Sequence, residues 1–190
     1  MPQRVFIDAN VLASRTILDW LFALQCLSRG MFTFHTSQDV LAETTRALRR
    51  KYPFAPGRII DHRITKISAV VEEIIQDFPG ELPFDGMDRD DYHVHAAAVA
   101  SHADIILTNN SKEDITRSPD VQHYEILGAD EFLMLVHDSA PQLVLTCTKQ
   151  QLDYWQTQEN FRGLDDALRR ADCPNFARAV REALKTLARQ

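Results

Sequence analysis

The sequence predicts an α/β protein built around a parallel sheet. Short apolar runs that are typical of buried strands alternate with longer segments in which apolar residues recur at helical spacing. Strands and helices that alternate in this way form right-handed βαβ units, whose strands are parallel. An alanine-rich segment near residue 97 also has the composition of a helix packed closely against a sheet.

The predicted elements follow one another along the first 140 residues. The segments predicted as strands are 4–8, 31–35, 104–107 and 122–127. The segments predicted as helices are 17–27, 37–51, 58–77, 90–101 and 129–137. Ser37 is the expected N-cap of the second helix. A loop is expected over 79–87, because this segment contains Pro83 and Gly86.

The character of the chain changes near Pro141. Three later segments look helical, 148–158, 164–171 and 175–188, and the one further strand candidate is 143–146. Residues 141–190 carry eight basic and six acidic residues, whereas residues 1–140 carry 13 basic and 21 acidic ones. We therefore predict two domains: residues 1–140, which contain the sheet, and residues 141–190, a helical extension.

Composition is that of an ordinary globular protein, with 45% hydrophobic and 25% charged residues. No apolar stretch has the length of a membrane span, and the first ten residues lack the organisation of a signal peptide. Cys26, Cys147 and Cys173 are widely spaced and form no CxxC pair, which argues against a disulfide framework or a zinc site. We expect reduced thiols, a cytoplasmic location and no membrane partner.

Acidic residues follow the predicted strands. One comes directly after the apolar run 5–7, one lies in the helix after the second strand, and three crowd the start of the alanine-rich helix. Because the carboxyl ends of parallel strands meet at one edge of a sheet, these side chains are expected to converge there. Such a cluster repels itself unless a cation offsets it, so the sequence predicts a divalent-metal site. Its acidic candidates are Asp8, Glu43, Asp88, Asp90 and Asp91.

Each of these positions also has a structural explanation. Asp8 could cap a helix, acids are favoured in any first helical turn, and Glu43 could pair with Arg46 at the surface. Three acids within four residues nevertheless exceed what capping requires. We favour Asp91 as a metal ligand because it shares a face with the buried small residues that follow. His95, one turn later, is expected to be solvated or to support the site, because hard cations select oxygen.

The net charge of −6 conceals an uneven distribution. Residues 43–66 hold seven basic and two acidic residues, whereas residues 72–91 hold eight acidic residues and one basic residue. An acidic metal centre beside a basic stretch fits a phosphodiester substrate that is gripped at its backbone. Solvated charged faces of two helices would explain the stretch equally well. The candidates for RNA binding are Arg46, Arg49, Arg50 and Lys51.

The ordered set FIDANVL, Glu43, DRDDYHVHAAA and ADIILTNN resembles the PIN-domain ribonucleases, and best the branch of VapC-like toxins from toxin–antitoxin pairs. The resemblance covers residues 1–138, and the helical tail is similar to an extension found on some VapC-like proteins. It implies a three-layer α/β/α fold and a Mg²⁺- or Mn²⁺-dependent endoribonuclease that hydrolyses RNA with a metal-activated water. It also implies a cognate antitoxin as partner and the pairing of two copies as a homodimer.

By motif position, the resemblance implies that Asp8, Glu43 and Asp91 form the metal-binding and catalytic centre. Many PIN domains place a fourth acid two residues after the Thr, and this chain has Asn110 there. An amide adds no negative charge, so a second cation would bind more weakly, and one-metal and two-metal chemistry both stay open. The residues expected to support the centre are Asn10, Asp88, Asp90, Thr108, Asn110, Glu113 and Asp114.

Two other functions compete with this one. The haloacid-dehalogenase-like phosphatases also place an Asp after the first strand and Thr-Asn after a later one. They need a second Asp two residues after the first, where this chain has Asn10, and their acidic pair follows the Thr strand. The other alternative is a PIN-fold binding module whose centre is weakened by Asn110. An antitoxin interface or core packing would each explain the apolar residues Leu18, Trp20, Leu21 and Phe22.

Overall fold

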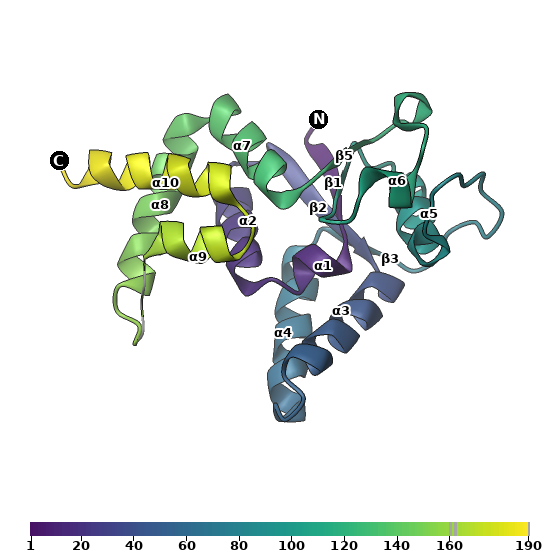
Figure 1. Cartoon of the computed structure of the whole chain (residues 1–190), viewed down its shortest axis with the longest axis horizontal. Helices are drawn as coiled ribbons and strands as arrows, with labels where there is room; N and C mark the ends of the chain where they lie inside the picture. The colour runs from purple at the N-terminus through teal and green to yellow at the C-terminus, as the bar shows by residue number, and fades with distance from the viewer. Residues whose placement is uncertain (160, 162, 190) are drawn as a thin grey trace. The chain divides into compact units, whose positions relative to one another are not determined.

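The computed structural model describes residues 1–159, 161 and 163–189, and the chain packs into two compact units (Figure 1). The first unit comprises residues 1–13 and 31–128, and the second comprises residues 14–30 and 129–190. This division differs from the single boundary predicted near residue 140. The difference arises because the first long helix packs with helices that follow residue 128, although it lies between two strands in the sequence.

A five-stranded parallel sheet with the strand order β3-β2-β1-β4-β5 forms the first unit, and helices flank it. Its strands are β1 (Gln3–Ile7), β2 (Phe32–Ser37), β3 (Glu73–Ile75), β4 (Ile105–Leu107) and β5 (Glu125–Leu127). The predicted α/β class and parallel sheet are thus confirmed. The side chains of 5–7 and 105–107 are at most 2% exposed, as expected of strands that are covered on both faces.

The prediction of one helix over 58–77 is wrong in its last part. The helix ends at Val70, and Ile74 and Ile75 pair in β3 with Thr36 and Ser37 of β2. The isoleucines continue the apolar spacing of the preceding helix, so periodicity alone could not separate the strand from it.

Helices and 3₁₀ turns of the first unit connect these strands. They are α1 (Ala9–Leu12), α3 (Gln38–Lys51), α4 (Gly57–Val70), η1 (Arg89–Asp91), α5 (Tyr92–Ala100), α6 (Lys112–Ile115) and η2 (Pro119–Val121). Ser37 caps α3 as predicted, since its hydroxyl accepts a hydrogen bond from the Val40 amide at 3.2 Å. Helices α3 and α4 lie side by side and form a hairpin that extends from the sheet (Figure 1).

The described part of the second unit is helical. Its helices are α2 (Arg15–Leu27), α7 (Ala129–Ser139), α8 (Pro141–Trp155), α9 (Leu164–Arg170) and α10 (Pro174–Leu187). The segment 143–146 lies inside α8, so it is not the strand that was considered. Leu18, Trp20 and Leu21 are buried, and the Trp20 ring meets Phe176 edge-on at 5.1 Å, so core packing explains them. Among the described residues, no helix is long and apolar enough to cross a membrane.

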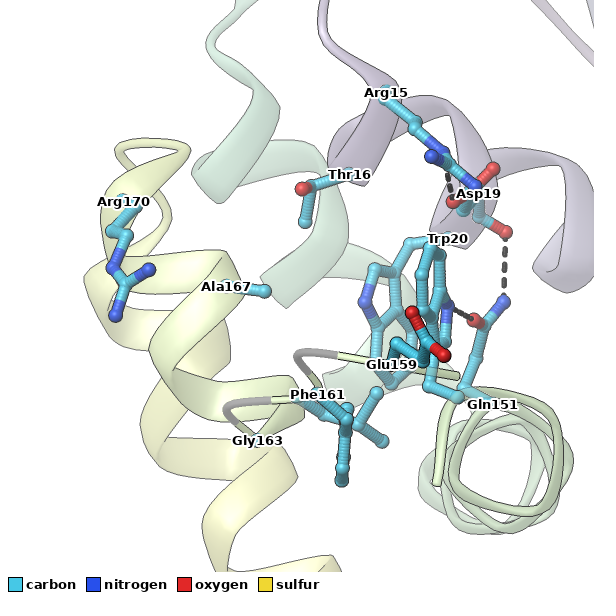
Figure 2. A pocket seen from close by; sticks show the side chains of 12 residues that line it. Arg15, Thr16, Asp19, Trp20, Gln151, Glu159, Phe161, Gly163, Ala167 and Arg170 are labelled. Atoms are coloured by element: carbon cyan, nitrogen blue, oxygen red, sulfur yellow. Dashed lines mark hydrogen bonds and ion pairs between the residues drawn. The ribbon is translucent and has the colours of Figure 1, made fainter. Parts of the chain in front are cut away.

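A pocket of about 360 Å³ lies within this second unit (Figure 2). Its walls include Trp20, Trp155 and Phe161, and the Arg15 guanidinium carbon lies 4.8 Å from the centroid of the Trp155 ring. Gln151 of α8 donates a hydrogen bond to the Asp19 carbonyl of α2 at 3.0 Å and so joins the two helices. Its side chain also accepts a hydrogen bond from Trp155 Nε1, within α8, at 3.0 Å. None of the predicted catalytic or metal-binding residues lines this pocket.

Candidate metal centre

The predicted residues gather at the carboxyl ends of the two central strands of the first unit. Asp8 follows β1 and Thr108 follows β4, and the Asp8 amide donates to the Leu107 carbonyl at 3.0 Å. Strand β1 lies between β2 and β4, so the chain leaves the centre of the sheet toward opposite edges. The place where the chain turns to opposite edges is called the switch point of the sheet. In open parallel sheets, ligands bind at this point.

Asp8 is held on both carboxylate oxygens. Its Oδ1 accepts a hydrogen bond from the Ala9 amide at 2.6 Å and so caps α1. Its Oδ2 accepts from the Thr108 hydroxyl at 2.7 Å and from Asn10 Nδ2 at 2.8 Å. The side chain is buried, and this burial raises the pKa of Asp8 although the hydrogen bonds oppose the shift. Asp8 therefore caps α1 and also belongs to the candidate site.

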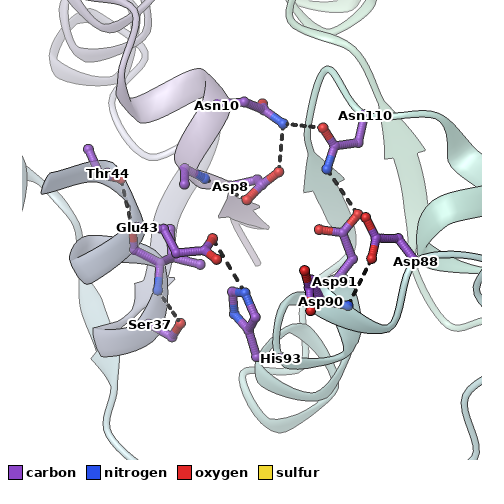
Figure 3. Close-up of polar contacts among 12 residues, drawn as sticks. Asp8, Asn10, Ser37, Glu43, Thr44, Asp88, Asp90, Asp91, His93 and Asn110 are labelled. Carbon is purple, nitrogen blue, oxygen red and sulfur yellow. Dashed lines mark hydrogen bonds and ion pairs between the residues drawn. The ribbon is translucent and has the colours of Figure 1, made fainter. Parts of the chain in front are cut away.

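Two amide side chains connect Asp8 to Asp91 (Figure 3). Asn10 Nδ2 donates to Asn110 Oδ1 at 2.9 Å, and Asn110 Nδ2 donates to Asp91 Oδ2 at 2.9 Å. The backbone amide of Asn110 also donates a hydrogen bond to the Thr108 hydroxyl at 3.1 Å, which fixes the start of the loop that follows β4. The polar residues that follow β1 and β4 thus form one continuous network with the first turn before α5.

The pKa of Asp91 is also raised. Burial raises its pKa to about 6, and the neighbouring charges of Asp8, Asp88 and Asp114 act in the same direction. The hydrogen bond from Asn110 opposes them. Acidic groups close to a nearly buried carboxylate disfavour its ionised form. A bound cation would offset this repulsion.

A close approach of two loops places Asp91. A Cβ atom on Gly86 would lie 2.2 Å from the Asp114 carbonyl oxygen, so a residue with a side chain cannot occupy this position without a shift of the backbone. The Met87 amide donates to the Glu113 carbonyl at 2.8 Å and secures the contact. The segment that precedes α5 is therefore held against α6, beside Asn110.

Glu43 faces His93 rather than Arg46. Its Oε2 lies 3.4 Å from His93 Nε2, within ion-pair distance, yet both ring nitrogens of His93 are buried without a hydrogen-bond partner in the part of the chain that is described. Figure 3 shows Glu43 to one side of Asp8 and Asp91 to the other, with the His93 ring below Asp8. The two ring nitrogens therefore leave hydrogen-bonding capacity free at the centre.

His93 is the site residue that sequence reasoning missed. The sequence had pointed to His95, one turn after Asp91, but His95 is buried, with its Nδ1 2.6 Å from the Tyr124 hydroxyl, and burial lowers its pKa. It is a core residue and not a solvated one. The helical spacing misled because Asp91 ends a 3₁₀ turn, and α5 begins only at Tyr92. The acids that shortly precede His93 in the sequence, Asp90 and Asp91, were the available signal.

The remaining predicted residues make local contacts. Asp88 caps η1, because its Oδ1 accepts from the Asp90 amide at 2.9 Å, while Asp90 itself is exposed. Glu113 accepts a hydrogen bond from the Ser111 hydroxyl, and Asp114 accepts from the Ser111 amide at 3.2 Å. The charges of Asp88 and Asp114 also act on Asp91 and raise its pKa.

A family model described as "PIN domain" matches residues 4–112, which include Asp8, Glu43, Asp91 and Asn110. The chain belongs to the PIN domain family. No curated protein and no solved structure compared with the chain matches it. PIN domains are typically nucleases and generally use divalent metal ions. The match thus confirms the family and leaves the VapC-like branch a prediction.

The donors of this PIN domain fit a hard divalent cation. Asp8 and Asp91 have no arginine or lysine within ion-pair distance in the described residues, and Glu43 and Asn110 add further oxygen atoms. The described residues contain no group of three acidic, histidine or cysteine side chains already arranged to hold a metal. Asn10 and Asn110 instead bridge the carboxylates, so their amides would have to yield for an ion to bind between Asp8 and Asp91.

Proposed function

We propose that this PIN domain is a divalent-metal-dependent endoribonuclease. The observation that carries the proposal is the pair Asp8 and Asp91 at the switch point of the sheet. These two buried carboxylates have no arginine or lysine partner among the described residues, and the basic group beside Asp8 is His93. Mg²⁺ or Mn²⁺, when bound, supplies positive charge for the phosphodiester and lowers the pKa of a coordinated water. Asp8, Glu43 and Asp91 are the proposed metal-binding residues.

Neighbouring polar side chains position these carboxylates. Thr108 and Asn10 both donate to Oδ2 of Asp8, which leaves that side chain one orientation. Asn110 does the same for Asp91. Because Asn110 is neutral, the centre has three proposed acidic ligands, and we propose that one tightly held cation suffices for hydrolysis.

RNA is the proposed substrate, and the basic stretch of α3 favours binding of such a polyanion. Arg46, Arg50 and Lys51 are exposed, as phosphate contacts require. Arg49 was predicted to bind RNA as well, but its Nη1 donates to the Ala55 carbonyl at 2.6 Å. We therefore assign backbone contacts to the first three residues and a structural role to Arg49.

Cleavage of a mixed-sequence RNA by the purified protein tests the proposal. Cleavage in Mg²⁺ or Mn²⁺ should stop in EDTA. Asp8→Asn should reduce kcat by more than about 100-fold, since even changes around metal ligands cost 10–100-fold. Asp77→Asn removes an exposed acid after β3 and serves as the matched control, with unchanged kcat expected. Equal cleavage by wild type and Asp8→Asn would contradict the proposed centre.

One observation favours a second function, a PIN-fold binding module without activity. Asn110 stands in place of an acid, and its amide already satisfies Asp91. RNA that is bound equally in EDTA and in Mn²⁺, and is cut in neither, would favour this module over the nuclease.

We also propose that the protein is the toxin of a toxin–antitoxin pair, with a cognate antitoxin and a homodimeric form. Its support is the order and spacing of the motifs around Asp8, Glu43 and Asp91. Expression of the wild-type chain should arrest growth, whereas Asp8→Asn should not. Unimpaired growth with an active nuclease would remove the toxin role and leave the enzymatic proposal intact.

A further inference from the structure

The hairpin of α3 and α4 ends in an exposed apolar tip that the fold does not explain. Phe54 is 98% exposed, Ile59 53% and Tyr52 43%, and we call these three residues the aromatic tip. Three large apolar side chains gathered at one protruding turn are costly to leave in water, and such groups mark interaction sites.

The tip is held in a defined shape. The Arg49 guanidinium donates to the Ala55 carbonyl at 2.6 Å, and the Ala55 amide donates to the Tyr52 carbonyl at 3.1 Å. The Lys51 ammonium lies 5.6 Å from the centroid of the Tyr52 ring. The exposed Phe54 therefore belongs to a closed turn that presents its ring, and a partner that binds there would pay little to order it.

Basic residues of the hairpin divide into two groups. Arg49 and Arg63 donate to the backbone carbonyls of Ala55 and Ala13, at 2.6 and 2.9 Å. The other group is exposed and has no acidic partner within ion-pair distance in the described residues. It consists of Arg46, Arg50, Arg58 and Lys66. Arg50 and Arg58 lie next to the aromatic tip in the sequence, whereas Arg46 and Lys66 lie further along α3 and α4.

Exposed rings among unpaired cations fit single-stranded nucleic acid. Bases stack on aromatic side chains regardless of sequence, and phosphates attract the surrounding guanidinium groups. Aromatic residues and arginine are also enriched at protein interfaces, so it is the unpaired positive charge that favours a polyanion. Glu43 and Lys51 lie on the same helix, eight residues apart, and a rise of 1.5 Å per residue separates them by about 12 Å. An RNA longer than a few nucleotides can therefore reach from the acidic centre to the tip.

We propose that the aromatic tip is a stacking platform for the single-stranded part of the RNA substrate, with Phe54 as its main contact and Arg50 and Arg58 on the adjoining phosphates. This inference rests on the proposed function, because RNA is the proposed substrate. It adds a binding site outside the acidic centre, one that contributes affinity for longer RNA and takes no part in bond cleavage.

Binding of labelled RNA in EDTA tests the platform without any dependence on catalysis. Phe54→Ala should weaken binding of a 12-nucleotide single strand about tenfold, as expected for the loss of one stacked base. Phe54→Trp should restore it. Binding of a duplex should not change, since it offers no free base. Val121→Ala, at another exposed apolar residue of the same unit, is the matched control.

The outcomes separate this inference from the proposed function. If Phe54→Ala binds the 12-nucleotide strand as well as wild type does, the platform is refuted, while metal-dependent cleavage would keep the nuclease. If binding depends on Phe54 but no metal supports cleavage, the platform stands and the nuclease fails. A change of oligomeric state in Phe54→Ala, with RNA binding intact, would assign the tip to contacts between copies and overturn the inference. Failure of wild type to bind RNA would overturn it as well.

Discussion

The acidic centre and the α3–α4 hairpin belong to the same unit but differ in the sign and the exposure of their charged side chains. At the centre, the buried carboxylates of Asp8 and Asp91 have no arginine or lysine partner among the described residues, so the fold holds them at an electrostatic cost. On the hairpin, four cations and the Phe54 ring stand in solvent. The difference implies that removing a charge at the centre abolishes activity without destabilising the fold, whereas changes on the exposed surface of the hairpin alter RNA binding alone.

The largest expected effect separates activity from stability at Asp8. Asp8→Asn should lose more than about 100-fold in kcat, and the metal-free variant should unfold at the same or a higher denaturant concentration than wild type. The reason is that burial raises the pKa of Asp8, so its charge opposes folding, and an amide carries no charge. Denaturant unfolding in EDTA measures this. A clearly less stable variant would mean that Asp8 is needed for its hydrogen bonds more than for metal binding.

Asp91 should make the metal-free protein less stable as pH rises. Its pKa is raised from 3.8 in the unfolded chain to about 6 in the folded one, so between these values the folded state binds the extra proton. The unfolding free energy therefore falls as pH increases from 4 to 6, by up to about 3 kcal/mol.

Unfolding in EDTA at several pH values, for wild type and Asp91→Asn, isolates this contribution. The variant should lack the decline that wild type shows over this range. Saturating Mn²⁺ should reduce the decline in wild type, because a cation stabilises the ionised carboxylate. Parallel pH profiles for the two proteins would show that Asp91 titrates normally.

Asn110 provides an intermediate test of the same centre. Asn110→Asp adds a carboxylate beside Asp91, so Mn²⁺ affinity should rise about tenfold, because ligand charge controls affinity at such sites. Calorimetric titration measures the change and reports whether a second ion binds. Asn109→Asp places the same charge one residue away and is the control. Equal affinities for both variants would place Asn110 outside the metal site.

The sequence predicted those parts of the fold and site that depend on strand position. Continuous apolar runs identified β1 and β4 because both are covered on two faces, and Asp8 and Thr108 follow from the ends of these strands. Strand β3 was missed because its two isoleucines continue the apolar spacing of α4.

Features that depend on tertiary approach were outside the reach of the sequence. The position of His93 results from a 3₁₀ turn that shifts the helical phase after Asp91. The bridge from Asn110 to Asp91 depends on the contact of Gly86 with α6, which joins segments that no local pattern connects. The membership of α2 in the second unit is of the same kind, since its sequence neighbours are two strands of the first.

The smallest expected effects are those of substitutions at two adjacent arginines of the hairpin, Arg49 and Arg50. Arg50→Gln should leave the unfolding free energy unchanged and reduce the salt dependence of RNA binding by about one phosphate contact. Arg49→Gln should instead lower the unfolding free energy by about 1 kcal/mol, because the bond to the Ala55 carbonyl is lost. RNA-binding titrations at several salt concentrations and denaturant unfolding distinguish the two. If Arg49→Gln affected only the salt dependence, the basic stretch of α3 would act as one uniform RNA-binding surface, and the structural role of Arg49 would be wrong.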